Sequence, residues 1–233
     1  MYTLILGDCL EKMKDIPNKT IDMIITDPPY GISYKSNKQK GDTRKGKEVI
    51  VRDQEYFHII EGDKTLNTEF ISICFEKLKD NGAIYIFCHW SKWSALEKEV
   101  LSSGFSIKNM IVINKSNHGM GDLKGTYAPK HELVLFATKG RHIFNKEQKR
   151  INDVFDGKVL FSGSHRFHPN EKPISWLLPF IRRSCTPNGV VLDPFMGAGS
   201  AGLACLKLNR NFIGIEIDEN FFNIAKDRIN KDD

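Results

Sequence analysis

The chain has 233 residues and a net charge of +5, and 40% of its residues are apolar, which suffices for the core of one large α/β domain. No apolar stretch approaches the length that spans a bilayer, and the chain begins with an expected strand, which argues against a membrane or secreted protein. The five cysteines show no metal-ligand spacing, so we predict no metal site and a reduced, cytoplasmic protein. We find no low-complexity linker and no internal repeat, and therefore expect residues 1–233 to form a single domain.

Short apolar runs alternate with helical patterns along the whole chain. The predicted strands are Tyr2–Leu6, Ile21–Thr26, Gly82–Cys88, Ile107–Ile113, Glu132–Thr138, Val190–Asp193 and Phe212–Ile217. The predicted helices are Cys9–Lys14, Glu69–Lys79, Ser91–Ser103, Ile174–Ser184, Ala201–Leu208 and Asn220–Ile229. Because the strands are almost continuously apolar, this order predicts a mostly parallel sheet of seven strands with helices on both faces.

A polar motif follows the second expected strand, at the edge where open α/β sheets bind ligands: Asp27-Pro28-Pro29-Tyr30. Asp27 can accept a hydrogen bond from an exocyclic amine. The prolines donate no N–H, so a backbone carbonyl can accept the second amine hydrogen. Tyr30 offers a flat face on which a planar base can stack. Each residue alone fits a turn with a core tyrosine, but the four together favour a base-binding site.

Basic residues gather directly after this motif. Between Lys35 and Arg52, seven basic residues stand against Asp42 and Glu48, a surplus equal to the net charge of the whole chain. We expect residues 31–67 to form a loop beside the active site that clamps phosphates around a target base. The alternative is a solvated loop without a partner. The residues predicted to bind DNA in this loop are Lys35, Lys38, Lys40, Arg44, Lys45 and Lys47.

A second basic stretch runs from Lys139 to Arg150. We expect Arg141 and Lys146 in this stretch to contact phosphate as well. The alternative is again a solvated polar loop.

The C-terminal part of the chain contains a glycine turn between a strand and a helix. Gly197 and Gly199 would let the backbone approach a ligand closely and adopt positive φ. Asp193, at the end of the preceding strand, is placed to meet a cationic group. Glu216 lies 19 positions after Gly197 at another strand end, where an acidic residue commonly accepts both hydroxyls of a ribose. Since the dinucleotide fingerprint G-x-G-x-x-G is absent, the turn favours a nucleoside with a charged, non-phosphate tail.

The motif Asp-Pro-Pro-Tyr, the run Asp-Pro-Phe-Met-Gly-Ala-Gly-Ser and the acidic strand end together resemble the S-adenosylmethionine (SAM)-dependent DNA amino-methyltransferases. The catalytic motif precedes the cofactor loop, an order that resembles the β class of this family. The resemblance extends from Leu4 to about Ile229, weakens at 31–67 and 139–164, and includes His168–Pro173. It implies a Rossmann-like class I methyltransferase fold with circularly permuted motifs, in which the last two strands lie beside the first.

The resemblance also implies roles in binding SAM. The implied cofactor-binding residues are Asp8, Cys9, Asp27, His168, Lys172, Asp193, Phe195, Gly197, Gly199, Ser200 and Glu216. The turn would surround the methionine part, with His168 and Lys172 shaping that side, and Glu216 would bind the ribose. Asp8 would bond the amine of the cofactor's adenine, or it simply caps the helix that follows.

The implied activity is a site-specific, adenine-specific DNA methyltransferase, which transfers the methyl group to N6 of an adenine flipped out of double-stranded DNA. Asp27, Pro28, Pro29 and Tyr30 would be the catalytic residues. The alternatives are the same chemistry on cytosine N4, RNA or a protein amide, and a non-catalytic DNA-binding homologue. Asp at the first motif position resembles the adenine enzymes, whereas cytosine-N4 enzymes more often begin with Ser. Two intact motifs argue against a pure binding module.

In this class, the interval 139–167 would carry target recognition. A role in restriction–modification would need a restriction endonuclease on a separate polypeptide, and the small size is consistent with a homodimer. Three further assignments are less specific. Trp90 and Trp93 are expected in the core, His131 and Glu132 fit either packing or a site role, and Tyr127 is either structural or in contact with the target base.

Overall fold

The computed structural model describes residues 1–30, 68–116, 125–146, 150–157 and 171–232. The chain divides into two units, Met1–Pro28 with Thr68–Asp233, and Pro29–Asn67. The fold described below is that of the first unit. None of the described helices is long and apolar enough to cross a membrane.

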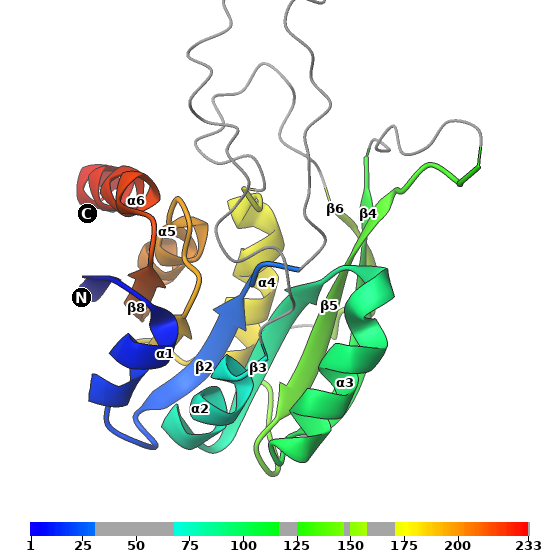
Figure 1. Cartoon of the computed structure of the whole chain (residues 1–233), viewed down its shortest axis with the longest axis horizontal. Helices are drawn as coiled ribbons and strands as arrows, with labels where there is room; N and C mark the ends of the chain where they lie inside the picture. The colour runs from blue at the N-terminus through cyan, green and yellow to red at the C-terminus, as the bar shows by residue number, and fades with distance from the viewer. Residues whose placement is uncertain (31–67, 117–124, 147–149, 158–170, 233) are drawn as a thin grey trace, which may run out of the picture. The chain divides into compact units, whose positions relative to one another are not determined.

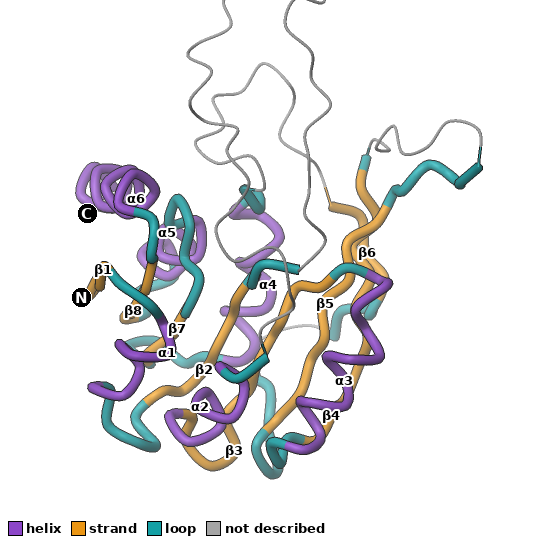
Figure 2. The backbone as a smooth tube through the Cα atoms, in the orientation of Figure 1, coloured by secondary structure: helices purple, strands orange, loops and turns teal. Residues whose placement is uncertain are grey.

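The first unit is built on one sheet with the strand order β1-β8-β7-β2-β3-β5-β4-β6 (Figures 1 and 2). Its strands are β1 (Tyr2–Leu6), β2 (Ile21–Thr26), β3 (Leu78–Cys88), β4 (Ser106–Lys115), β5 (His131–Thr138), β6 (Val154–Gly157), β7 (Val190–Asp193) and β8 (Asn211–Glu216). Only β5 runs antiparallel to its two neighbours. The mostly parallel sheet and all seven predicted strands are therefore confirmed.

The predicted number of strands was wrong by one, because the sheet of the described chain has eight. The additional strand β6 has only four residues, is largely exposed and pairs with β4 at the edge of the sheet. Its sequence Val-Phe-Asp-Gly is too short and too polar to form a buried run. Backbone pairing with β4, which depends on tertiary structure, is what defines it.

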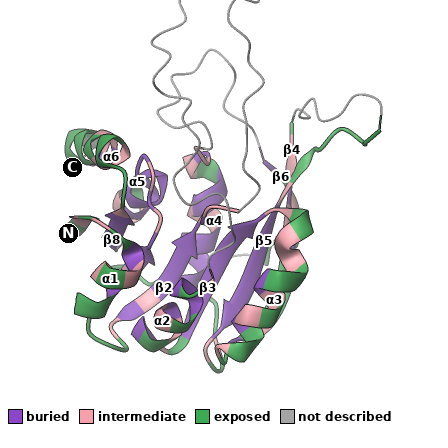
Figure 3. Cartoon of the chain, viewed as in Figure 1, coloured by how far each residue is buried: buried purple, intermediate pink, exposed green. Residues whose placement is uncertain are grey.

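Helices cover both faces of the sheet, as predicted (Figure 1). They are α1 (Cys9–Lys12), η1 (Met13–Asp15), α2 (Phe70–Lys77), η3 (Trp90–Lys92), α3 (Trp93–Ser102), α4 (Ile174–Ser184), α5 (Ser200–Lys207) and α6 (Glu219–Asp232). Alternate residues of β2 serve opposite faces: Met23 and Ile25 pack with α4 and α5, and Ile24 packs with α1, α2 and α3. The central strands are accordingly buried on both sides (Figure 3). All five cysteines are buried and reduced, which agrees with their apolar surroundings.

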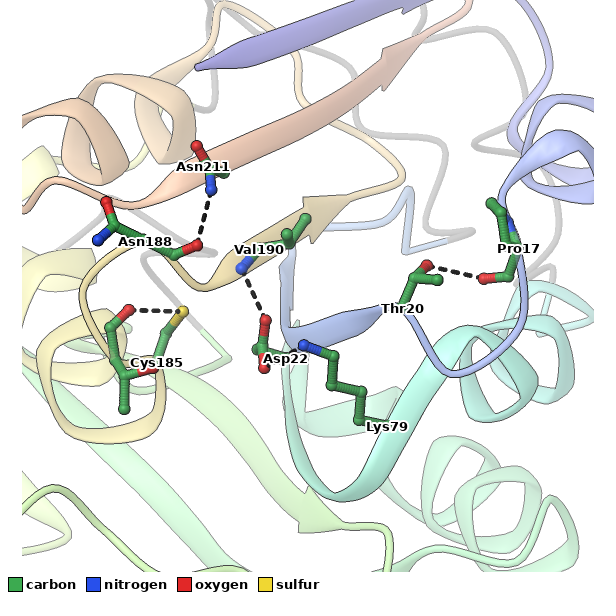
Figure 4. A network of polar contacts seen from close by, with 9 residues as sticks. Pro17, Thr20, Asp22, Lys79, Cys185, Asn188, Val190 and Asn211 are labelled. Carbon is green, nitrogen blue, oxygen red and sulfur yellow. Dashed lines mark hydrogen bonds and ion pairs between the residues drawn. The ribbon is translucent and has the colours of Figure 1, made fainter.

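The strand order joins the two ends of the sequence. β8 pairs with β1, and β7 lies between β8 and β2, with Met23 opposite Val191. At the start of β2, the Asp22 carboxylate accepts hydrogen bonds from Val190 N at 2.8 Å and from Lys79 Nζ at 2.7 Å (Figure 4). The expected meeting of the N-terminal and C-terminal halves is therefore confirmed, and both halves end their strands at the same edge.

We call this edge, where β2, β3, β4, β7 and β8 end, the C-terminal edge. β5 begins there because it is antiparallel, with Leu133 opposite Cys88 and His131 opposite Asn114. The other edge, where β2 and β3 begin, is the N-terminal edge.

Candidate active site

Asp27 lies at the C-terminal edge, directly after β2, and is held by an ion pair. Its Oδ2 accepts a hydrogen bond from Lys172 Nζ at 2.6 Å, and only 24% of the Asp27 side chain and 12% of the Lys172 side chain are exposed. Burial lowers the pKa of Lys172, but the carboxylates of Asp27 and Glu132 outweigh it and leave that pKa raised. A charged ammonium group therefore stays beside Asp27. The ring of Phe87 also lies 5.3 Å from Lys172 Nζ.

Pro28 is buried at the end of this segment. Pro29 and Tyr30 belong to the second unit of the chain, so the distances within the site join residues of the first unit.

The glycine turn follows β7, one strand away from Asp27. Gly197 and Gly199 have φ of 51° and 82°, in the left-handed region that favours glycine. A Cβ on Gly199 would in addition lie 3.0 Å from the Cβ of Ala225 in α6. The turn is fixed to β8 by hydrogen bonds from Met196 N to the Ile215 carbonyl and from Gly197 N to Glu216 Oε2, at 2.9 and 2.8 Å. The backbone conformation predicted from the two glycines is therefore present.

Glu216 lies where β8 ends and joins three segments. Its Oε2 accepts a hydrogen bond from Gly197 N, and its Oε1 accepts one from Asp218 N at 2.9 Å. Its backbone carbonyl accepts a third hydrogen bond from Gly7 N at 2.8 Å. Burial raises the pKa of Glu216, although the backbone N–H donors lower it. A carboxylate has about four acceptor positions, so these two bonds leave capacity for the hydroxyls of a ribose.

Asp193 is a buried carboxyl group that is repelled by the charges of both Asp27 and Glu216. Its Oδ1 accepts from Phe195 N at 3.1 Å. Burial, together with the charges of Asp27 and Glu216, raises its pKa to about 7. The hydroxyl of Thr26 lies close enough to lower this pKa, although it makes no hydrogen bond of normal geometry to a described residue. Asp27 is already paired with Lys172, so Asp193 and Glu216 are the carboxyl groups that make this part of the edge a favourable place for a cation.

Asp8 caps α1, because its Oδ1 accepts from Leu10 N at 2.8 Å. The capping interpretation is thus confirmed, and contact with an adenine stays a prediction for this exposed residue. Cys9 is buried, and burial raises the pKa of its thiol to about 12, so the thiol stays protonated.

Sequence reasoning missed two exposed apolar residues, Leu6 and Ile217, near the ends of β1 and β8. Leu6 and Ile217 are 40% and 56% exposed, and Leu6 lies opposite Glu216 in the pairing of β1 with β8. For Ile217, the signal in the sequence was an apolar residue directly after the acidic residue that ends β8. Both side chains suit the flat apolar ring of a nucleobase.

Ser200, the first residue of α5, contacts a buried ion pair that the sequence did not reveal. Its hydroxyl donates to Glu171 Oε1 at 3.4 Å, and Arg228 of α6 donates to the same oxygen at 2.6 Å. Arg228 also donates to the carbonyl of Ala198 in the glycine turn at 2.6 Å. Glu171 and Arg228 therefore fasten the segment that carries Lys172 to the glycine turn. No local signal marks either residue, because their link depends on the packing of α6.

Only two of the predicted DNA-binding residues, Arg141 and Lys146, lie in the described part of the chain. Lys35, Lys38, Lys40, Arg44, Lys45 and Lys47, together with His168, lie outside the described residues. Arg141 and Lys146 lie at the N-terminal edge, away from Asp27. Arg141 N bonds Asn81 Oδ1 at 2.9 Å, and Asn145 N bonds the Arg183 carbonyl at 2.8 Å. The physical reason is the antiparallel direction of β5, which carries the following residues to that edge.

The interval 139–167 returns toward the C-terminal edge through β6. Ser116 N donates to the carbonyl of Gly157, the last residue of β6, at 3.3 Å. The first and last described parts of the interval 139–167 therefore lie at opposite edges of the sheet.

Trp90 is 66% exposed just beyond the end of β3, so its expected place in the core was wrong. Leu96 and Val100 of α3 fill the core at this point, and Trp93 packs partly buried against it. Tyr127 is fully exposed. Among the described residues, no three His, Cys, Asp or Glu side chains are placed to hold a metal ion.

The sheet, the glycine turn and the acidic end of β8 define the class I methyltransferase architecture. A sequence profile of the DNA methylase family matches residues 21–227. The chain is 30% identical over 98% of its length to the type II methyltransferase M.HinfI of Haemophilus influenzae and covers 68% of that protein. It is 31% identical over 98% of its length to the type II methyltransferase M2.LlaDCHI of Lactococcus lactis subsp. cremoris and covers 89% of it.

The crystal structure of an M1.HpyAVI–SAM complex superposes with a TM-score of 0.73 at 29% identity, covering 98% of this chain and 100% of the other. The chain therefore belongs to the N6/N4 DNA methyltransferases, a family of SAM-dependent enzymes.

Proposed function

We propose that this protein is a site-specific DNA methyltransferase that modifies N6 of adenine. The observation that supports it most directly is the place of Asp27, the first residue of an Asp-Pro-Pro-Tyr motif. It lies directly after β2, one strand from the glycine turn, and its carboxylate is held by Lys172. Asp at this motif position favours adenine over cytosine. The same pocket geometry serves both amines, so the choice of base is the finer part of the proposal.

The residues at the C-terminal edge fit SAM. When bound, SAM supplies a methyl group on a positively charged sulfur. The buried carboxyl of Asp193 and the turn around Phe195, Gly197 and Gly199 would meet the cationic methionine part. Ser200 lines the start of α5 on the same side.

The ribose and adenine of the cofactor fit the neighbouring strand ends. Glu216 would accept the ribose hydroxyls, and Asp8 would accept from the adenine amine at the end of β1. Leu6 and Ile217 would pack against its ring, and Cys9 would lie behind them as an apolar neighbour.

The acceptor amine would be held by Asp27 and the backbone carbonyl of Pro28. Both accept hydrogen bonds from the N–H groups of the amine, which localises the nitrogen lone pair and points it at the methyl group. The carboxylate of Asp27 then stabilises the positive charge that develops on nitrogen, and that nitrogen afterwards loses a proton to solvent. Because the amine is paired inside a duplex, the base must leave the stack, and Tyr30 would stack on it.

DNA would approach the C-terminal edge. The basic segment within 31–67 would bind phosphates, and the part of 139–167 that follows β6 would carry target recognition. Trp90 presents an exposed aromatic surface at this edge that suits stacking on a base. Arg141 and Lys146 would reach phosphates only at a distance from the flipped base.

The similarity to type II methyltransferases supports a role in restriction–modification, for which the endonuclease would be a separate polypeptide. A cytoplasmic location and a homodimer agree with a small DNA-modifying enzyme, and we keep both as parts of the proposal.

The test is methyl transfer from labelled SAM to mixed-sequence duplex DNA, followed by nucleoside analysis. We expect N6-methyladenine. N4-methylcytosine would overturn the assignment to adenine and retain the mechanism. Label absent from duplex DNA, while the protein still binds SAM, would overturn the assignment to DNA, and RNA would be offered next.

A further inference from the structure

Four charged side chains of alternating sign lie in a row at the C-terminal edge. Asp27 pairs with Lys172 at 2.6 Å, and Glu132 pairs with Lys115 at 3.0 Å. Each comes from a different part of the fold: the end of β2, the segment before α4, the start of β5 and the end of β4. Val134, on the same face of β5 as Glu132, lies opposite Phe87, and the Phe87 ring lies 5.3 Å from Lys172 Nζ, so the two pairs are neighbours on one face of the sheet. Burial lowers the pKa of Lys172, and the charges of Asp27 and Glu132 together raise it, in agreement with this arrangement.

The row is sheltered from water. The exposed fractions of the Lys172, Lys115 and Glu132 side chains are 12%, 18% and 23%. Buried charges are costly unless they are paired, and removing one partner leaves the next charge uncompensated. The charge of Lys172 is therefore balanced by two carboxylates, of which Asp27 makes the direct ion pair.

The topology explains how a side chain of β5 reaches this place. β5 is antiparallel to β3 and β4, so it starts where its neighbours end, and Glu132 lies opposite Ile113 in β4. Burial is the main reason that the pKa of Cys88, which ends β3 beside Asp27, is raised, and the charges of Asp27 and Glu132 add to it. A parallel strand at this position would have placed its first residues at the other edge.

We propose that Glu132, supported by Lys115, is a positioning residue for methyl transfer. It holds the Lys172 ammonium from the β5 side and so fixes the Asp27 carboxylate in the orientation that receives the acceptor amine. This inference rests on the proposed function of Asp27. Glu132 itself touches neither the acceptor amine nor the cofactor in this assignment, so it acts through Lys172.

The first test compares Glu132→Gln with the wild-type enzyme. We expect kcat to fall by about tenfold, because a misplaced catalytic group loses part of its orientation effect. The Kd for SAM should change by less than about threefold, since β2 and β3 separate β5 from β7 and the glycine turn that follows it. Glu132→Asp, which keeps the charge, should recover part of the lost kcat. An unchanged kcat in Glu132→Gln would overturn the inference.

The matched control is Asp22→Asn. Asp22 is also a carboxylate paired with a lysine, at 2.7 Å from Lys79 Nζ, but it lies at the N-terminal edge (Figure 4). This variant should lower the melting temperature and leave kcat unchanged. An equal loss of kcat in both variants would mean that Glu132 acts through general stability, which overturns a positioning role.

A double-mutant cycle tests the route through Lys172. In the Lys172→Met background, Glu132→Gln should cause little further loss of kcat, because the group it positions is gone. Independent, additive losses would overturn the inference. If Glu132→Gln fails to fold, Lys115→Met gives the second test. We expect a smaller loss of kcat in this variant, and an unchanged kcat would contradict the inference.

Wild-type methylation is measured first. A wild-type enzyme that methylates no DNA refutes the proposed function, whereas an active wild type with an equally active Glu132→Gln variant refutes only the positioning role.

Discussion

The two edges of the sheet differ in how far their carboxyl groups are buried. At the N-terminal edge, Asp22 and Asp80 each pair with lysine, and the hydrogen bond and charge of Lys19 hold the pKa of Asp80 below its usual value. The C-terminal edge has such pairs at Asp27 and Glu132 too, but it also carries Asp193 and Glu216, whose pKa values are raised by burial.

The difference separates groups that hold the fold together from groups that are ready for a ligand. A carboxylate with its own lysine is satisfied in the folded chain, whereas crowded carboxyl groups are stabilised by an added cation. The C-terminal edge also exposes apolar surface at Trp90 and Ile217. The comparison therefore supports the proposed binding site through its electrostatics, independently of motifs.

The largest effect is expected from Asp27→Ala. In the proposed mechanism Asp27 stabilises charge only as it develops on the acceptor, so methyl transfer should fall by at least about a hundredfold. Binding of SAM should stay within a few fold, as measured by calorimetry. Normal turnover by this variant would remove Asp27 from the mechanism, and Asp80→Asn at the other edge is the control.

A smaller effect is expected from Glu216→Ala, which should weaken SAM binding. A hydrogen bond to a charged group contributes about 1.5–3 kcal/mol, so loss of the hydrogen bonds to the ribose should raise Kd by about tenfold or more. Calorimetry measures this directly. Glu219→Ala, an exposed acidic residue at the start of α6, should leave Kd unchanged. Equal affinity in Glu216→Ala and wild type would contradict the assignment.

The third prediction compares basic residues. Neutralising Lys35, Lys38 and Lys40 should weaken DNA binding and reduce the slope of log K against log salt by about one for each phosphate that is no longer neutralised. Neutralising Arg141 and Lys146, at the N-terminal edge, should change the slope less. Fluorescence anisotropy over a salt series measures both slopes. A larger change from the second pair would place the DNA along the N-terminal edge.

The smallest effect concerns pH. The pKa of Asp193 is raised from 3.8 to about 7 in the fold, so the folded protein binds a proton there that the unfolded chain releases. This contribution to stability is full below about pH 4 and is lost as pH rises to about 7. Binding of a cationic cofactor should tighten over the same interval, because the cation favours the ionised carboxyl.

Melting temperatures and SAM affinities between pH 5 and 8 test this linkage. The difference between the pH profiles of wild type and Asp193→Asn gives the effect of Asp193 alone, without that of Glu216, whose pKa is also raised. Parallel pH profiles for the two proteins would show that Asp193 does not titrate in this range.

Much of the site could be predicted because its parts are local. The left-handed φ of Gly197 and Gly199, the cap made by Asp8 and the acidic end of β8 each follow from a few neighbouring residues. Trp90 was predicted wrongly because an apolar residue after a strand is exposed or buried according to what packs on it. The distance of Arg141 from Asp27 followed from the direction of β5, which apolar content alone does not reveal.

The sequence by itself determined seven of the eight strands of the described sheet, their mostly parallel order and the residue types of the two motifs, because strand patterns and turn residues act over short distances. The tertiary structure alone decided the partners. It paired Asp27 with Lys172, Glu171 with Arg228 and Lys115 with Glu132, which are 145, 57 and 17 positions apart in the chain. Ion pairs across such separations depend on strand order and on the direction of β5, and these are set by the packing of the whole sheet.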